Sequence, residues 1–185
     1  MEIRPYDPAT DRSGLYDCKL AFEHGLGAGT GDADKAEAYV GKLTPSYREE
    51  WLTWVDRCVA DDERCVTVAI EEGPGGNGDG DGDSPLADPV VGYVFCLPER
   101  LAFVWDAAVI NELYVAPHHR GTGVADDLMD AALELAADQD LPLDRVVLDV
   151  DRGNERARAF YDRHGFEHWG EMVARHVEQS DLSHS

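Results

Sequence analysis

Basic residues are scarce in this chain of 185 residues. It has 16 Lys and Arg against 38 Asp and Glu, a formal net charge of −22, and its only lysines are Lys19, Lys35 and Lys42. Nucleic-acid binding needs a basic surface, so that class of function is excluded. The acids are spread along the whole chain, which favours a solvated surface in a salt-rich cytoplasm and a halophilic source. A cationic partner steered by the field is the alternative.

Long apolar runs and paired cysteines are also missing. No stretch approaches the ~20 apolar residues of a membrane span, and residues 1–7 lack the pattern of a signal peptide. We therefore expect a cytoplasmic protein that does not contact membranes. The four cysteines form no Cys-x-x-Cys pair and have no histidine at zinc-ligand spacing, so we expect reduced, buried thiols and no metal. They are Cys18, Cys58, Cys65 and Cys96.

Hydrophobic periodicity predicts a single α+β domain over residues 1–177 with a polar tail at 178–185. The expected sheet is mostly antiparallel, and the crossover between residues 109 and 150 makes its two strands parallel. A glycine-rich break is expected at 24–30, and Ser46 with Glu49 has the pattern of a capping box. Expected strands are 3–6, 65–70, 90–97, 109–115, 145–150 and 168–177; expected helices are 11–23, 32–43, 46–61, 124–137 and 154–164.

Residues 72–89 are rich in glycine and aspartate and contain almost nothing that can be buried. The composition predicts a flexible acidic hairpin loop between two strands. The Asp-x-Asp-x-Asp alternation also invites a calcium interpretation. An EF-hand loop needs a glutamate at its twelfth position and flanking helices, and the sequence supplies neither.

The most informative stretch is Arg120-Gly121-Thr122-Gly123-Val124-Ala125, which joins the predicted strand 109–115 to the helix 124–137. Glycines let a ligand approach the backbone closely. The first turn of a helix carries unpaired N–H groups and partial positive charge, so this unit suits a phosphate or pyrophosphate. A plain helix start with permissive glycines is the alternative.

A second pattern follows about 30 residues later: Asn154-x-x-Ala157-x-x-Phe160-Tyr161-x-x-x-Gly165-Phe166. Together with Arg120-x-x-Gly123-x-Ala125 after a strand, it resembles the GNAT (GCN5-related) N-acetyltransferase superfamily. The resemblance is close over residues 110–166. It implies a mixed, mostly antiparallel sheet flanked by helices, in which a splayed strand pair forms the cleft for acyl-CoA.

The resemblance implies roles for single residues. The backbone from Arg120 through Gly121, Thr122, Gly123, Val124 and Ala125 would hold the CoA pyrophosphate, and Leu113, Tyr114 and Val115 would pair with the pantetheine arm. Asn154 would bond the pantetheine or a water molecule, and Tyr161 would protonate the departing thiolate. Purely structural roles, a helix cap for Asn154 and a core aromatic for Tyr161, are the alternatives.

Glu112 is the candidate general base, because the attacking amine must lose a proton and acids near this point act through water in several family members. Strand alternation places Glu112 and Tyr114 on the face opposite Asn111 and Leu113. A solvated or salt-bridged strand residue is the alternative for Glu112.

The expected function is transfer of an acetyl group from acetyl-CoA to a primary amine, by direct attack in a ternary complex. No cysteine stands at a marked nucleophile position, which disfavours an acyl-enzyme. The alternative is a non-catalytic acyl-CoA sensor. The acceptor is a small-molecule or protein amine, and pairing of the final strand is a route to homodimers in the resembled family.

Overall fold

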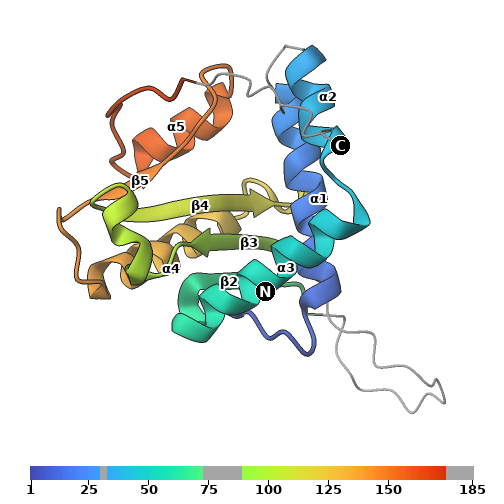
Figure 1. The fold of residues 1–185 in the computed structure, drawn as a ribbon, viewed down its shortest axis with the longest axis horizontal. Helices are drawn as coiled ribbons and strands as arrows, with labels where there is room; N and C mark the ends of the chain where they lie inside the picture. The colour runs from blue at the N-terminus through green and yellow to red at the C-terminus, as the bar shows by residue number, and fades with distance from the viewer. Residues whose placement is uncertain (30–32, 73–88, 174–185) are drawn as a thin grey trace, which may run out of the picture.

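The computed structural model describes residues 1–29, 33–72 and 89–173, and its elements confirm the expected α+β class (Figure 1). Five strands form one sheet in the order β1-β2-β3-β4-β5. Neighbours are antiparallel except β4 and β5, which are parallel as the crossover predicts. The strands are β1 Glu2–Pro5, β2 Val66–Ile70, β3 Val90–Cys96, β4 Ala108–Val115 and β5 Val146–Leu148; the α-helices are α1 Arg12–Gly29, α2 Ala33–Gly41, α3 Pro45–Asp61, α4 Val124–Asp138 and α5 Glu155–Arg163.

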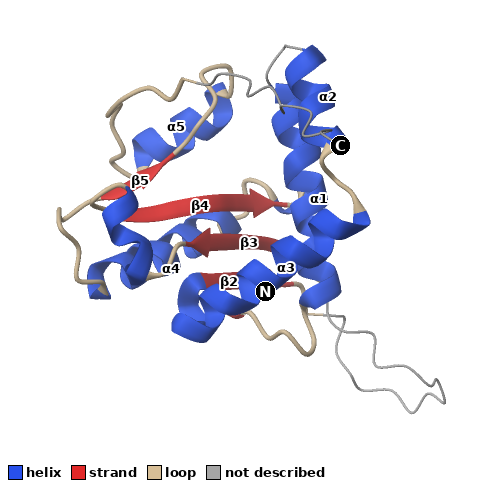
Figure 2. Cartoon of the chain, viewed as in Figure 1, coloured by secondary structure: helices blue, strands red, loops and turns tan. Residues whose placement is uncertain are grey.

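Helices cover both faces of the sheet (Figure 2). On one face α1 and α3 pack an aromatic core, in which Trp51 lies 6.5 Å from Tyr93 and 6.4 Å from Phe95 between ring centroids. On the other face α4 buries Leu128, Leu135 and their neighbours against β3 and β4. Each fully buried side chain of this size contributes roughly 1.5–3 kcal/mol. These two layers hold β4 in the middle of the molecule.

Three local expectations are wrong. The helix α1 continues to Gly29 through the predicted break, because packing against α2 and β3 outweighs the ~1 kcal/mol cost of each helical glycine. The cap of α3 is Thr44, whose hydroxyl accepts from the N–H of Tyr47, and not Ser46. Residues 168–173 form no strand, and Trp169 there is 77% exposed. The neighbouring edge strand β5 has only three residues.

The predicted loop at 72–89 lies largely outside the described residues, as do the tail and the end of the last predicted strand. The four cysteines are free and buried, as expected. No helix within the described ranges is long and apolar enough to cross a membrane.

Candidate acyl-CoA site

The strand β4 changes its pairing at Ile110. Its partner β5 pairs only with Ala108, Val109 and Ile110, so residues 112–115 pair with β3 alone within the part of the chain that the structure describes. In Figure 1, α5 lies beyond β4 on this side of the sheet. The backbone of residues 111–115 therefore has an edge to which an extended ligand can add as a strand.

A β-bulge sets the side-chain directions at this point. Phe95 pairs with Glu112 and Cys96 with Ile110, which leaves Asn111 as an extra residue on β4. A bulge shifts the alternation by one position. As a result Ile110 and Leu113 both pack on the α4 side of the sheet, while Tyr114 packs on the side of α1 and α3.

The glycine loop follows β4 and leads into α4. Gly121 has φ +80° and Gly123 has φ +97°, a region that side-chain-bearing residues avoid. Gly123 is the N-cap of α4, and its carbonyl accepts from Asp126 and Asp127. A Cβ at either glycine would meet nothing within 4 Å, so the backbone is open to a ligand. The backbone N–H groups at the start of α4 have no partner within the helix, so they suit an anion.

Arg120 stands between this loop and β4. Its Nε donates to the carbonyl of Val115 at 2.9 Å, and its guanidinium lies 5.9 Å from the ring of Tyr114. Burial and the nearby charge of Arg156 lower the pKa of Arg120. Two guanidinium groups close enough to repel each other beside an open helix start favour an anion with more than one charge. The side chain of Thr122 instead bonds within the loop, donating to the carbonyl of His119 at 2.7 Å.

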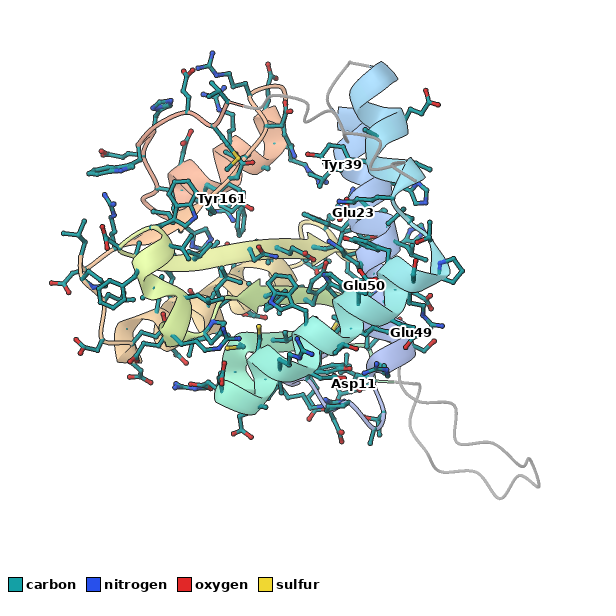
Figure 3. The ribbon with its side chains drawn as sticks, viewed as in Figure 1. Asp11, Glu23, Tyr39, Glu49, Glu50 and Tyr161 are labelled. Carbon is teal, nitrogen blue, oxygen red and sulfur yellow. The ribbon has the colours of Figure 1, made fainter. Side chains whose placement is uncertain are left out.

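Helix α5 places the downstream motif. Asn154 is its N-cap, and the Asn154 side chain accepts from the N–H of Ala157 at 3.1 Å. Tyr161 is partly buried between Phe160 and Phe166, with ring centroids 5.5 and 5.7 Å away, and burial raises the pKa of Tyr161 to about 12. Figure 3 shows Tyr161 on the part of α5 that faces β4.

The end of α5 is tied to the start of α4. Asp126, in the first turn of α4, contacts Arg163 at 2.5 Å and the Nε2 of His164 at 2.9 Å. These contacts fix the helix of Tyr161 against the glycine loop. The structure thus brings the two sequence motifs together, although they are separated by about 30 residues in the chain.

Glu112 lies in a buried network and not at an open edge. Its Oε1 is 2.7 Å from the Nζ of Lys19, which is also 2.5 Å from the Oε1 of Glu23. All three side chains are at most 6% exposed. Oε1 also accepts from Asn111 and Trp51, whereas Oε2 accepts from Tyr93 at 2.5 Å. Within the described residues no contact joins Glu112 to Tyr161.

Burial and charge oppose each other in this network. Burial works to lower the pKa of Lys19, but Glu112 and Glu23 outweigh it and raise that pKa. Burial works to raise the pKa of Glu23, but Lys19 and Lys42 outweigh it and lower that pKa. Both groups are therefore charged at neutral pH. We define Glu23, Lys19 and Glu112 as the buried triad.

Sequence reasoning missed Lys19 and Glu23. They stand four residues apart in α1 and continue the buried stripe that includes Leu15 and Cys18. A lysine and a glutamate on the apolar face of a helix are a detectable signal, because such residues are almost never fully buried unless they are paired.

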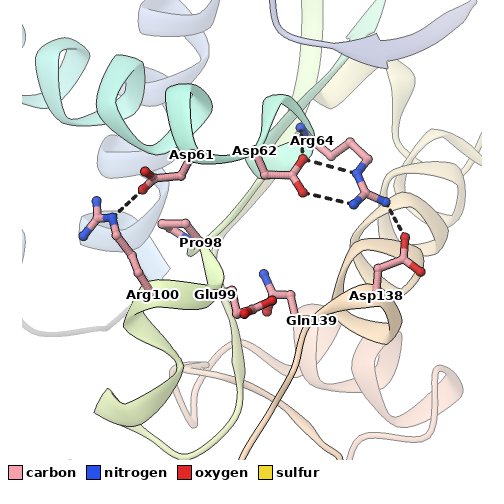
Figure 4. A pocket seen from close by; sticks show the side chains of 8 residues that line it. All are labelled: Asp61, Asp62, Arg64, Pro98, Glu99, Arg100, Asp138 and Gln139. Carbon is pink, nitrogen blue, oxygen red and sulfur yellow. Dashed lines mark hydrogen bonds and ion pairs between the residues drawn. The ribbon is translucent and has the colours of Figure 1, made fainter.

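A separate cavity of about 310 Å³ lies at the other end of α4 (Figure 4). Ion pairs of Arg64 with Asp62 and Asp138, and of Arg100 with Asp61, surround it. The length of α4 puts it roughly 20 Å from the glycine loop. This cavity is therefore not part of the candidate site. Among the described residues, no three His, Cys, Asp or Glu side chains are arranged to hold a metal ion.

Comparison with known families decides the assignment. The model of the acetyltransferase (GNAT) family matches residues 32–166, more than half of the chain. The chain belongs to the GNAT acetyltransferase family. No curated protein matches it.

Solved structures share this GNAT fold at low identity. The PaiA N-acetyltransferase of Thermoplasma acidophilum, solved with coenzyme A, is 18% identical with a TM-score of 0.61, over 98% of this chain and 93% of that one. The aminoglycoside 6′-N-acetyltransferase of Acinetobacter haemolyticus is 16% identical with a TM-score of 0.57, over 97% and 100%. Naa20 of Chaetomium thermophilum, solved with a bisubstrate analogue, is 19% identical with a TM-score of 0.52, over 89% and 70%.

Proposed function

We propose that this GNAT protein transfers an acetyl group from acetyl-CoA to a primary amine by direct attack in a ternary complex. The observation that carries the proposal is the open edge of β4 at residues 111–115, next to a helix that begins at positive-φ glycines. One element suits an extended amide-bearing arm and the other a pyrophosphate, and acetyl-CoA contains both.

The proposed donor site uses mainly backbone atoms. The edge at Leu113, Tyr114 and Val115 would bond the pantetheine arm, and the amides from Gly121 to Ala125 would hold the pyrophosphate, aided by the charge of Arg120. Asn154 would reach the arm from the start of α5. These residues fit the group because the positions around Gly121 and Gly123 are open and the pairing of β4 with β5 has already ended.

Two side chains would move protons. The amine nitrogen attacks the thioester carbon, the C–N bond forms, and the C–S bond breaks. Tyr161 would give its proton to the leaving thiolate; burial raises its pKa to about 12, so it is protonated at neutral pH. Glu112 would take the amine proton through a water molecule on Oε2, which accepts only from Tyr93 within the described residues and has acceptor capacity left.

An acyl-CoA sensor without turnover is the alternative. The test is thiol release from acetyl-CoA, measured with and without each member of a panel of primary amines. The proposal predicts release that needs both the protein and an amine, together with an acetylated amine detected by mass. Binding of acetyl-CoA with no amine-dependent release would favour the sensor. The aminoglycoside substrate named for the Acinetobacter relative makes polyamino compounds a sensible part of the panel.

A further inference from the structure

Lys42 fills a site that is built for an ammonium group. Its Nζ lies 2.9 Å from the Oε2 of Glu23, 4.9 Å from the ring centroid of Tyr39 and 5.5 Å from that of Tyr47. A carboxylate and the faces of aromatic rings are the groups that bind ammonium ions. Figure 3 shows Tyr39 and Glu23 close together where α2 meets α1. We call Glu23, Tyr39 and Tyr47 the ammonium cage.

Lys42, which fills the ammonium cage, is partly exposed, whereas Glu23, the carboxylate of the cage, is buried. The Lys42 side chain is 38% exposed, whereas Glu23 is 2% exposed. Lys42 follows α2 in the link to α3, so its side chain reaches inward from the surface. A flexible, partly solvated side chain loses little when another cation replaces it, since water then takes up its charge.

The buried triad needs one further cation on the side of Glu23 that faces Lys42. The buried triad has two carboxylates and one ammonium, hence one net negative charge. Burying an uncompensated charge is costly, so a further cation must pair with Glu23. Lys42 supplies it in the free protein. An ammonium group of a ligand supplies the same charge to the same oxygen.

The cage is also near the proposed reaction. The Nζ of Lys19 bridges Glu23 and Glu112 with contacts of 2.5 and 2.7 Å. Glu112 is followed directly on β4 by the residues proposed to hold the pantetheine arm. The contacts through Lys19 therefore place the ammonium cage next to Glu112, the proposed base.

We infer that the ammonium cage binds the second ammonium group of the acceptor and that Lys42 leaves it when the acceptor enters. The acceptor class is then an aliphatic diamine or polyamine, which binds by one charged nitrogen and is acetylated on another. This inference rests on the proposed function for the acetylation step. The binding step stands by itself.

Calorimetric titration of the full chain with butane-1,4-diamine and butan-1-amine tests the binding step. The wild type should bind the diamine about tenfold more tightly, because only the diamine can place one nitrogen in the cage and a second nitrogen on the Glu112 side. Lys42→Ala should bind the diamine more tightly still, because its internal competitor is gone. Arg57→Ala, which removes an exposed positive charge from α3, should behave as the wild type.

Paired variants separate the cage from general electrostatics. Tyr39→Phe keeps the ring and should keep the diamine preference, whereas Tyr39→Leu should reduce it. Glu23→Gln should abolish it, with the melting temperature checked for folding. Equal affinity for both amines, or a preference that is the same in Lys42→Ala and in the wild type, would overturn the inference and make Lys42 a permanent structural partner of Glu23.

The two proposals can fail separately. A diamine preference in binding, with no thiol release from acetyl-CoA, would contradict the proposed acetyltransferase activity but still support the ammonium cage. Equal thiol release with monoamines and diamines, and no preference between them in binding, would contradict the ammonium cage but still support the proposed acetyltransferase activity.

Discussion

Lys19 is the residue on which the interior electrostatics of the molecule depend. It is 3% exposed and contacts carboxylates on two elements, Glu23 of α1 and Glu112 of β4. Removing one member of a buried ion pair leaves an uncompensated charge, which costs more than the pair itself contributes. The same ammonium also fixes Glu112, which the proposed mechanism uses as a base.

We predict that Lys19→Met lowers the free energy of unfolding by about 3–5 kcal/mol, measured by urea denaturation. The raised pKa of Lys19 means that its contribution is present below the unfolded lysine value of ~10.4 and is lost as pH rises through the folded value. The lowered pKa of Glu23 gives a contribution that is present above ~4.3 and is lost as pH falls. The deficit of the variant should therefore be largest between these limits. An equal deficit at pH 3 and pH 7 would contradict the ion-pair account.

Tyr161→Phe tests the proposed acid with almost no change in shape. Both rings can pack between Phe160 and Phe166, so stability and acetyl-CoA affinity should be unchanged. Turnover should fall about 100-fold or more if the hydroxyl protonates the thiolate. Steady-state rates and a calorimetric Kd separate the two effects. Unchanged turnover would remove Tyr161 from the mechanism and leave it as a core aromatic.

At the scale of elements, the start of α4 makes the clearest prediction. Gly123→Val puts a branched side chain at φ +97°, which costs roughly 1–2 kcal/mol, and it covers the backbone that the pyrophosphate needs. We expect the acetyl-CoA affinity of this variant to fall by at least about tenfold. The small loss of folding stability would not by itself cause such a fall, because the variant stays folded.

Gly25→Ala is the matched control for that variant. Gly25 lies inside α1, has open space around it and has no positive φ, so alanine should be neutral or stabilising by up to ~1 kcal/mol. Its acetyl-CoA affinity should equal that of the wild type. If Gly123→Val binds acetyl-CoA as well as Gly25→Ala does, the loop does not hold the pyrophosphate.

The glycines also show what the sequence could and could not predict. The motif around Gly121 and Gly123 was placed correctly, because a strand before it and a helical pattern after it supply local context. Gly25 and the glycines near it lie inside the helix α1, although glycines there predict a break. The helix continues because α1 packs against segments that are distant in the sequence, and a local pattern does not show that packing. The strand expected at 168–177 is missing over 168–173, the part of it that the structure describes, for a related reason: a strand needs a partner edge, and periodicity does not reveal one.

The candidate site divides in the same way. Backbone features such as the cap at Asn154 and the parallel pairing of β4 with β5 follow from local patterns and topology. The partners of Glu112 do not, because Lys19 is 93 residues away in the chain. Strand alternation predicts that Glu112 shares a face with Tyr114 opposite Leu113, but only the packed structure shows that this face meets a buried ammonium.

At the scale of the whole molecule, we expect the net charge to make stability depend on salt. A net charge of −22 makes the folded chain repel itself, and salt shortens the range of that repulsion from about 10 Å at 0.1 M to about 3 Å at 1 M. We predict that the melting temperature rises between 0.1 and 1 M KCl at pH 7, by roughly 2–4 °C for each ~1 kcal/mol of repulsion relieved. The increase should shrink near the pI of about 4.4. An equal increase at both pH values would contradict a charge-based origin.

The acetyl transfer itself is the central claim, and one measurement tests it most directly. The full chain in molar KCl is mixed with acetyl-CoA and butane-1,4-diamine, and free CoA thiol and acetylated diamine are quantified together, with the Tyr161→Phe variant alongside. The proposed function predicts equal amounts of the two products, formed far more slowly by the variant. Thiol release without acetylated amine, or no release while acetyl-CoA binds, would contradict it.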